Sequence, residues 1–204
     1  MLLDAQECQL VLMDYQLRLM PALHDAGMSI ANAVSLAYMA GLMQVPTFVT
    51  EQSPDKLGET LPELRNALAK AHAQSISKTH FSAVQAGLAD LLRPPAKAPA
   101  GNARSLPKHL QKAVVTAPER NTVVLAGCEA HVCLLQTALE LLEDEFEVWV
   151  VTDACSSRTE RNRDATFDRL ASAGVELVTT EMVAFEWMRS AEHPAFKAMQ
   201  ALIK

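Results

Sequence analysis

The feature that most constrains the fold of this chain is a regular alternation of short apolar runs with longer segments of helical spacing. The apolar runs occupy residues 8–13, 45–50, 122–127, 146–152 and 175–179. Segments with helical spacing occupy residues 30–43, 61–72, 131–144 and 160–173. Strands and helices in alternation predict a parallel sheet, and strands that are apolar throughout predict a sheet covered on both faces.

We therefore expect an α/β fold built on a three-layer, doubly wound and mainly parallel sheet of about six strands, with helices on both faces. The chain has 204 residues, half of them hydrophobic, which suits a single domain over residues 1–204. In such sheets, functional groups collect at the carboxyl ends of the strands. Polar residues that directly follow the apolar runs are therefore the first candidates for a site.

One stretch interrupts the alternation and predicts a loop insertion at about 93–118. It contains five of the ten prolines, and no acidic residue lies between Asp90 and Glu119, where all the charged residues are Lys or Arg. Charged, proline-rich segments usually form solvated surface loops, and we favour that interpretation. A lid over an anionic substrate, or a contact with an acidic neighbouring subunit, is the alternative.

Charge and composition exclude several classes of function. Lys and Arg number 18 against 24 for Asp and Glu, so the formal net charge is −6, and we expect no nucleic-acid partner. Residues 1–7 hold two acids where a secretory signal carries positive charge, which predicts a cytoplasmic protein. Residues 26–50 carry no charge, but Asn32, Gly41 and Pro46 interrupt them, which favours a buried helix and strand over a membrane span.

Three residues that could perform chemistry stand where this fold concentrates it. Asp14 ends the first apolar run, Lys78 follows a short run at 74–77, and Cys133 lies in the first turn of the helix after residues 122–127. A helix amino terminus and an ammonium group are expected to lower the pKa of the thiol, and a carboxylate can accept its proton. Each residue alone also fits a structural role, as a buried thiol, a cap or a solvated lysine.

Three segments of the chain resemble the signature segments of the isochorismatase-like cysteine hydrolases, in the same order. They are LVLMDYQ at 10–16, SKTHFSA at 77–83 and VLAGCEAHVC at 124–133. Residues 50–52, Gly58, 153–158 and 193–197 are similar to the metal-free branch of that family, close to the isochorismatase domain-containing proteins. The resemblance covers nearly the whole chain apart from the basic insertion.

The resemblance implies roles for the three candidates. Cys133 would be the nucleophile, Asp14 its general base and Lys78 the cation that holds the thiolate and orients the carboxylate. The resemblance also implies a cis peptide bond between Cys128 and Glu129, which would turn the backbone amides of Glu129 and Cys133 towards the substrate oxygen as an oxyanion hole. The implied reaction is hydrolysis of a small amide, ureido or related carbonyl compound through a thioester on Cys133.

Five further residues lie beside these segments and are candidates for lining the substrate pocket, since pockets combine apolar walls with a few polar groups. They are Gln16, Gln52, His80, Phe81 and His131. Each residue also has an ordinary structural interpretation. Phe81 could be a core residue, the amides of Gln16 and Gln52 could be hydrogen-bonded within the protein, and His80 and His131 could be exposed in the first turns of helices.

The chain departs from the metal-dependent members of the wider family. Nicotinamidases carry an Asp-x-His and a further histidine after the second strand, whereas residues 51–56 here read EQSPDK. We therefore expect no metal and no cofactor, and we disfavour nicotinamide as substrate. Isochorismate is also disfavoured, because members that act on it do not rely on the cysteine, which this chain retains as Cys133.

Two alternatives to the hydrolase remain open. One is a non-catalytic protein that binds a small molecule or serves as an oligomeric scaffold while it retains the hydrolase fold. The other is a redox sensor in which Cys133 is oxidised and Cys128 resolves it, although the bend between them opposes such a pairing. Beyond a small-molecule substrate, the resemblance implies a homo-oligomer, dimer or tetramer, and residues 30–43 and 131–144 are more apolar than surface helices require.

Overall fold

The computed structural model describes residues 1–94 and 120–203. Apart from Arg93 and Pro94, the basic insertion predicted at 93–118 therefore lies outside the described residues. A single domain over residues 1–204 remains a prediction for the same reason.

The core of the molecule is one sheet of six strands in the order β3-β2-β1-β4-β5-β6, and every neighbouring pair is parallel. The strands are β1 (Cys8–Met13), β2 (Thr47–Gln52), β3 (Gln74–Lys78), β4 (Thr122–Gly127), β5 (Glu147–Val151) and β6 (Glu176–Val178). The central strands β1 and β4 are buried along their whole length. This confirms the doubly wound α/β fold with about six strands that the alternation predicts.

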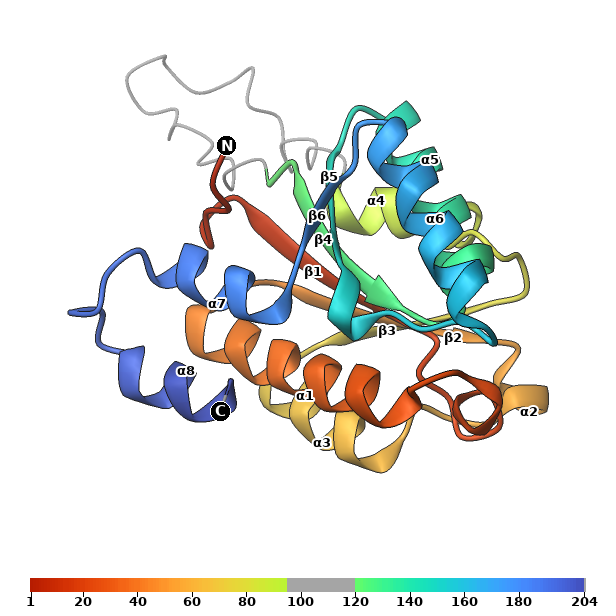
Figure 1. Cartoon of the computed structure of the whole chain (residues 1–204), viewed down its shortest axis with the longest axis horizontal. Coiled ribbons are helices and arrows are strands. Elements are labelled where there is room, and N and C mark those ends of the chain that lie inside the picture. Colours follow the sequence, from red (N-terminus) through yellow and green to blue (C-terminus); the bar gives the residue numbers. More distant parts are fainter. Residues whose placement is uncertain (95–119, 204) are drawn as a thin grey trace, which may run out of the picture.

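Helices cover both faces of the sheet, which makes three layers. On one face lie α1 (Ala26–Met43), α3 (Pro62–Lys70), α7 (Thr180–Met188) and α8 (Phe196–Leu202); on the other lie α4 (Leu88–Leu92), α5 (Leu135–Glu143) and α6 (Glu160–Ser172) (Figure 1). Short helical turns follow several strands, namely η1 (Met20–Ala22), α2 (Pro54–Leu57), η2 (Val84–Ala86), η5 (Ala130–Leu134) and η6 (Thr152–Ala154).

Helix α1 is the element that explains the uncharged stretch of the sequence. Within the described residues it alone has the length and apolar composition of a membrane-crossing helix, with a mean hydropathy of 1.3. Its Ala33, Leu36 and Ala37 are completely buried in the core cluster, and α3, α7 and α8 pack beside it. One face of α1 therefore packs into the core, and its neighbours are other helices of the same layer.

Strand β2 differs from the apolar run that predicted it, because it covers Thr47–Gln52 rather than residues 45–50. The polar residues Glu51 and Gln52 stay in the strand because their backbone pairs with Ser77 and Lys78 of β3. The apolar run of the sequence ends at Thr50, but backbone pairing with a neighbouring strand extends the strand itself beyond that residue. The extension matters, since it brings Gln52 level with Lys78.

The carboxyl ends of β1 and β4 approach each other unusually closely. A Cβ atom added at Gly127 would lie 2.5 Å from the Cβ of Met13, so only glycine fits at this register position. Just beyond, the Cys128 amide donates to the Met13 carbonyl at 3.0 Å. The glycine thereby brings the segment after β4 against Asp14, which follows Met13.

Candidate active site

The side chains of Asp14, Lys78 and Cys133, singled out from the sequence, meet at the carboxyl edge of the sheet. Asp14 follows β1, Lys78 ends β3, and Cys133 lies in the helical turn after β4. The Lys78 Nζ atom donates to Asp14 Oδ2 at 2.7 Å, and both side chains are completely buried. The Cys133 thiol is close enough to both charged groups for each to act on its pKa.

Lys78 has a hydrogen-bond acceptor for each of its three ammonium protons. Besides Asp14, it donates to Gln52 Oε1 at 2.7 Å and to the carbonyl of Phe81 at 3.1 Å. A buried ammonium is tolerated only when it is paired and hydrogen-bonded in this way. Lys78 is therefore held in one position by three different segments of the chain.

Asp14 is held by the neighbouring strand as well as by Lys78. The Thr50 hydroxyl donates to Asp14 Oδ1 at 2.6 Å, and the Asp14 amide donates to the Thr50 carbonyl at 3.0 Å. The backbone of Asp14 is left-handed, with a φ of 59°, which turns the chain away from the strand direction. Thr50 was not among the residues singled out from the sequence, although its place at the end of an apolar run could have signalled it.

The thiol of Cys133 differs from the sequence-based expectation of a lowered pKa. Burial and the negative charge of Asp14 raise its pKa to about 12, and the opposing effect of Lys78 is smaller. Cys133 also lies within the π-helical turn Ala130–Leu134, before α5 begins at Leu135, rather than in the first turn of a regular α-helix. The expectation failed because it counted the cation and the helix terminus but not the desolvation of the sulfur.

Gln52 links the thiol to the ion pair. Its Oε1 atom accepts from Lys78 and lies 4.0 Å from Cys133 Sγ, while its Nε2 atom donates to the Thr79 carbonyl at 2.8 Å. Gln52 is therefore a predicted pocket residue whose amide oxygen faces both the lysine and the thiol. Its side chain is half-buried, so it borders both the cluster and the solvent side.

Gln16 is completely buried, and its amide is fully used by backbone groups. Its Nε2 atom donates to the carbonyls of Gln52 at 3.0 Å and Gly58 at 2.6 Å, and its Oε1 atom accepts from the Gln52 amide at 2.8 Å. The side chain therefore supports the end of β2 and leaves no free polar atom for a substrate.

The other three predicted pocket residues lie around the cluster. His80 is exposed, and Phe81 is 54% exposed although its carbonyl reaches Lys78. His131 is half-buried and hydrogen-bonded through Nδ1 to Ser157 Oγ at 3.0 Å. Their contact with a substrate remains a prediction.

The segment that precedes the nucleophile is held by the loop after β5. The peptide bond between Cys128 and Glu129 is cis. The Ala130 amide donates to the Ser156 carbonyl at 2.8 Å, and Arg158 Nε donates to Glu129 Oε1 at 2.6 Å. Among the hydrogen bonds between described residues, none uses the Glu129 amide.

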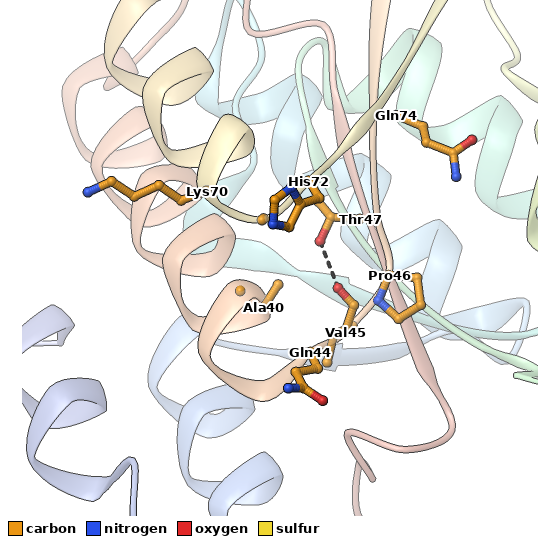
Figure 2. Close-up of a pocket in the computed structure, with 10 residues that line it drawn as sticks. Ala40, Gln44, Val45, Pro46, Thr47, Lys70, His72 and Gln74 are labelled. Atoms are coloured by element: carbon orange, nitrogen blue, oxygen red, sulfur yellow. Dashed lines mark hydrogen bonds between the residues drawn. The ribbon is translucent and has the colours of Figure 1, made fainter.

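Two hollows lie near polar residues, and only one adjoins the cluster. A hollow of about 350 Å³ is bordered by Ser53, Lys78, Thr79 and His80. The other, of about 310 Å³, lies at the amino ends of β2 and β3, where Thr47 Oγ1 donates to the Val45 carbonyl (Figure 2). The second hollow is at the opposite end of the sheet from Cys133.

The described residues contain no group of three or more His, Cys, Asp or Glu side chains that could hold a metal ion. The remaining cysteines, Cys8, Cys128 and Cys155, are buried and unpaired by disulfides, and burial raises the pKa of each thiol. Asp14, Lys78 and Cys133 thus form the one place in the described chain where a thiol adjoins a buried ion pair.

Comparison with known proteins finds relatives of this chain in one family. The family model for the isochorismatase domain matches residues 106–182. Isochorismatase domain-containing protein 2 from Bos taurus is 35% identical over 175 residues, which are 86% of this chain and 72% of that protein.

Solved structures show the same fold. A structure described as MAR1 ribonuclease from Caenorhabditis elegans is 30% identical and superposes with a TM-score of 0.83, covering 100% of this chain and 92% of its own. YcaC from Escherichia coli, described as an octameric hydrolase of unknown specificity, gives a TM-score of 0.76 at 24% identity, over 98% of this chain and 87% of its own.

Proposed function

This chain belongs to the isochorismatase family, and on that premise we propose that it is a metal-independent cysteine hydrolase of a small amide, ureido or related carbonyl compound. The observation that carries the proposal is a buried thiol close enough to a buried carboxylate–ammonium pair for both charges to act on its pKa, at the carboxyl edge of the sheet. A nucleophile beside a base, with the base oriented by a third group, is the arrangement that acyl transfer requires.

The first half of the reaction forms an acyl-enzyme. Cys133 Sγ attacks the carbonyl carbon while its proton passes to the carboxylate of Asp14. The negative charge on the substrate oxygen is stabilised by the backbone amides of Glu129 and Cys133. When the tetrahedral intermediate collapses, the carbon–nitrogen bond breaks, the leaving amine takes the proton from Asp14, and a thioester remains on Cys133.

The second half of the reaction restores the thiol. Asp14 takes a proton from a water molecule as the oxygen of that water attacks the thioester carbonyl. The carbon–sulfur bond breaks, the acid product leaves, and the proton returns from Asp14 to Cys133 Sγ. The oxygen of the water is thus retained in the product, and the enzyme returns to its starting state.

The high pKa of Cys133 is consistent with this proposal, because it makes the base indispensable. A thiol with a pKa of about 12 is almost fully protonated at neutral pH, so attack must be accompanied by proton removal. Asp14 is the group placed to remove it. In this proposal Lys78 and Thr50 keep the carboxylate pointed at the sulfur, each through a hydrogen bond to one of its oxygens.

For the pocket, we propose that Gln52, His80, Phe81 and His131 face the substrate, while Gln16 acts on it only through Gln52. Gln52 is the candidate best supported, since its amide already reaches both Lys78 and the thiol. The exposed ring of Phe81 would supply an apolar wall beside the scissile group.

The same high pKa also supports a second candidate, a non-catalytic protein that binds a small molecule with the triad residues in place. In such a protein the protonated thiol of Cys133 would be a buried group of the binding site and would not act as a nucleophile. The similarity to a structure described as a ribonuclease adds RNA to the compounds that should be tested, although the net charge of −6 opposes a polyanionic substrate.

The deciding experiment is a screen of small primary amides, ureido compounds and a short RNA with the wild-type protein, Cys133→Ser and Asp14→Asn. The hydrolase predicts turnover of a carbonyl compound, a mass increase on Cys133 during turnover, and loss of both in the serine variant. Asp14→Asn is expected to lower the rate by about 10²–10⁴-fold, because the general base is lost. Turnover that persists in Cys133→Ser would exclude the covalent mechanism.

We also propose that the protein assembles as a homo-oligomer, a dimer or tetramer. The octameric description of YcaC and the exposed apolar residues Met28 and Leu42 of α1 support this. Sedimentation or gel filtration that finds only a 22.2 kDa particle would contradict it.

A further inference from the structure

Two segments that carry the proposed catalytic groups are joined to each other outside the cluster. The loop after Lys78 and the helix after Cys133 meet through Ser82, whose hydroxyl donates to Glu140 Oε2 at 2.7 Å. Gln85 Nε2 donates to the same carboxylate oxygen at 3.1 Å. One carboxylate on α5 therefore holds two side chains of the loop.

A buried backbone contact reinforces this junction. The Ala83 amide donates to the Thr137 hydroxyl at 2.9 Å, and both residues are completely buried. Thr137 and Glu140 lie three residues apart on α5, so they face the same side of the helix. We refer to Ser82, Ala83, Thr137 and Glu140 as the loop–helix junction.

We propose that Glu140 is a positioning residue, which through Ser82 holds the loop after Lys78 at a fixed distance from the nucleophile Cys133. The inference rests on the proposed function, and it deepens that function by adding a residue that touches neither substrate nor thiol. Glu140 is half-buried and Ser82 is buried, and a carboxylate suits this place because a single one of its oxygens accepts from both Ser82 and Gln85.

The link from Glu140 to the cluster runs through the backbone next to Ser82. Phe81, the preceding residue, supplies the carbonyl that accepts from Lys78 Nζ at 3.1 Å. On the other side, α5 begins at Leu135, directly after the turn that contains Cys133. A shift of the loop relative to α5 would therefore move the Phe81 carbonyl, one of the three acceptors of Lys78, relative to the helix that follows Cys133.

The test compares Glu140→Ala, Ser82→Ala and the double variant with Glu143→Ala, a matched control that changes an exposed glutamate of the same helix. We expect each single variant to lower kcat about tenfold with KM within about twofold, which is the pattern for a loss of transition-state alignment. The double variant should be no slower than the slower single one, because both changes break the same hydrogen bond. Glu140→Gln, which keeps an acceptor oxygen, should recover most of the activity.

A second readout needs no substrate. The rate at which iodoacetamide modifies Cys133 is measured against pH in each variant by peptide mass spectrometry. Loosening the loop admits water to the cluster, which weakens the effect of burial, so the alkylation profile of Glu140→Ala should move to lower pH. If that variant does not fold, Glu140→Met fills the site without an acceptor and replaces it.

The proposal is overturned if Glu140→Ala and Glu143→Ala match in both kcat and alkylation profile, or if the effects of Ser82→Ala and Glu140→Ala simply add. A wild-type protein that hydrolyses nothing in the screen would refute the proposed function instead. The alkylation profile then still decides: a shift in Glu140→Ala but not in Glu143→Ala supports the junction, and an unchanged profile overturns it.

Discussion

The two ends of the sheet both present a lysine beside a hollow, yet they differ in the burial of charge. At the carboxyl end, Lys78 and Asp14 form an ion pair with no exposed side-chain surface. At the amino end, the exposed Lys70 lies with its Nζ atom 5.0 Å from the centre of the Tyr38 ring, beside the hollow of Figure 2. The comparison teaches that a hollow alone does not mark a reactive site, since desolvated charge is present at one end only.

The largest difference between the two ends should appear on removing their lysines. Lys78→Met leaves the Asp14 carboxylate buried without its partner, which should lower the free energy of unfolding by about 3–5 kcal/mol. Lys70→Met loses only a cation–π contact at an exposed position and should change it by no more than about 1 kcal/mol. Urea unfolding of both variants measures the two losses in the free energy of unfolding. Equal losses would contradict the proposed difference between the two ends of the sheet.

Two glycines sharpen the comparison at the level of packing. In Gly127→Ala the new methyl group would collide with Met13, which should destabilise the protein by about 1–3 kcal/mol. In Gly41→Ala, at the amino-end hollow, the nearest atom is 3.5 Å away, and the helix gains up to about 1 kcal/mol. The two substitutions should therefore shift the Tm in opposite directions in thermal unfolding. An unchanged Tm for Gly127→Ala would show that β1 and β4 can move apart to accept the methyl group.

The pH dependence of alkylation tests the electrostatics at the carboxyl end. With a thiol pKa of about 12, the rate for Cys133 should rise about tenfold per pH unit from neutral pH to about pH 11. Asp14→Asn removes a negative charge that raises this pKa, so the pKa falls and alkylation at pH 8 becomes faster, while hydrolysis becomes slower. The exposed Asp55→Asn serves as the control, and slower alkylation of Asp14→Asn would contradict the assignment of charges.

The smallest effect is expected at the amino-end hollow itself. His72 is exposed and lies far from the cluster, so His72→Ala should leave kcat and KM within about twofold and stability within about 0.5 kcal/mol. Steady-state kinetics with the substrate found in the screen measures this. A larger loss of activity would mean that the two ends of the sheet are coupled.

Much of the fold could be predicted because the pattern of apolar runs is local. The run ending before Asp14 and the run ending at Gly127 became the two central strands, and both are buried over their whole length. The places of Asp14, Lys78 and Cys133 followed from the rule that carboxyl ends of parallel strands share one edge. What could not be predicted from the pattern is the environment of each group.

The pKa of Cys133 shows why the rest required the tertiary structure. The sequence places a lysine and a helix start near the thiol, and both lower a pKa, but burial and the carboxylate of Asp14 outweigh them. Burial depends on all segments packed around the sulfur, and no local pattern reports it. Glu140 was missed for a related reason, since 58 residues separate it from Ser82 along the chain.

The sequence by itself therefore determined the alternation of strands and helices, the edge where chemistry could collect, and the family to which the chain belongs. The tertiary structure alone decided which oxygens hold Lys78, that the amide of Gln16 is used by backbone groups, and that burial raises the pKa of the thiol. The physical reason is that apolar periodicity depends on residues that are neighbours in the sequence. Desolvation and hydrogen-bond pairing depend on groups that only folding brings together.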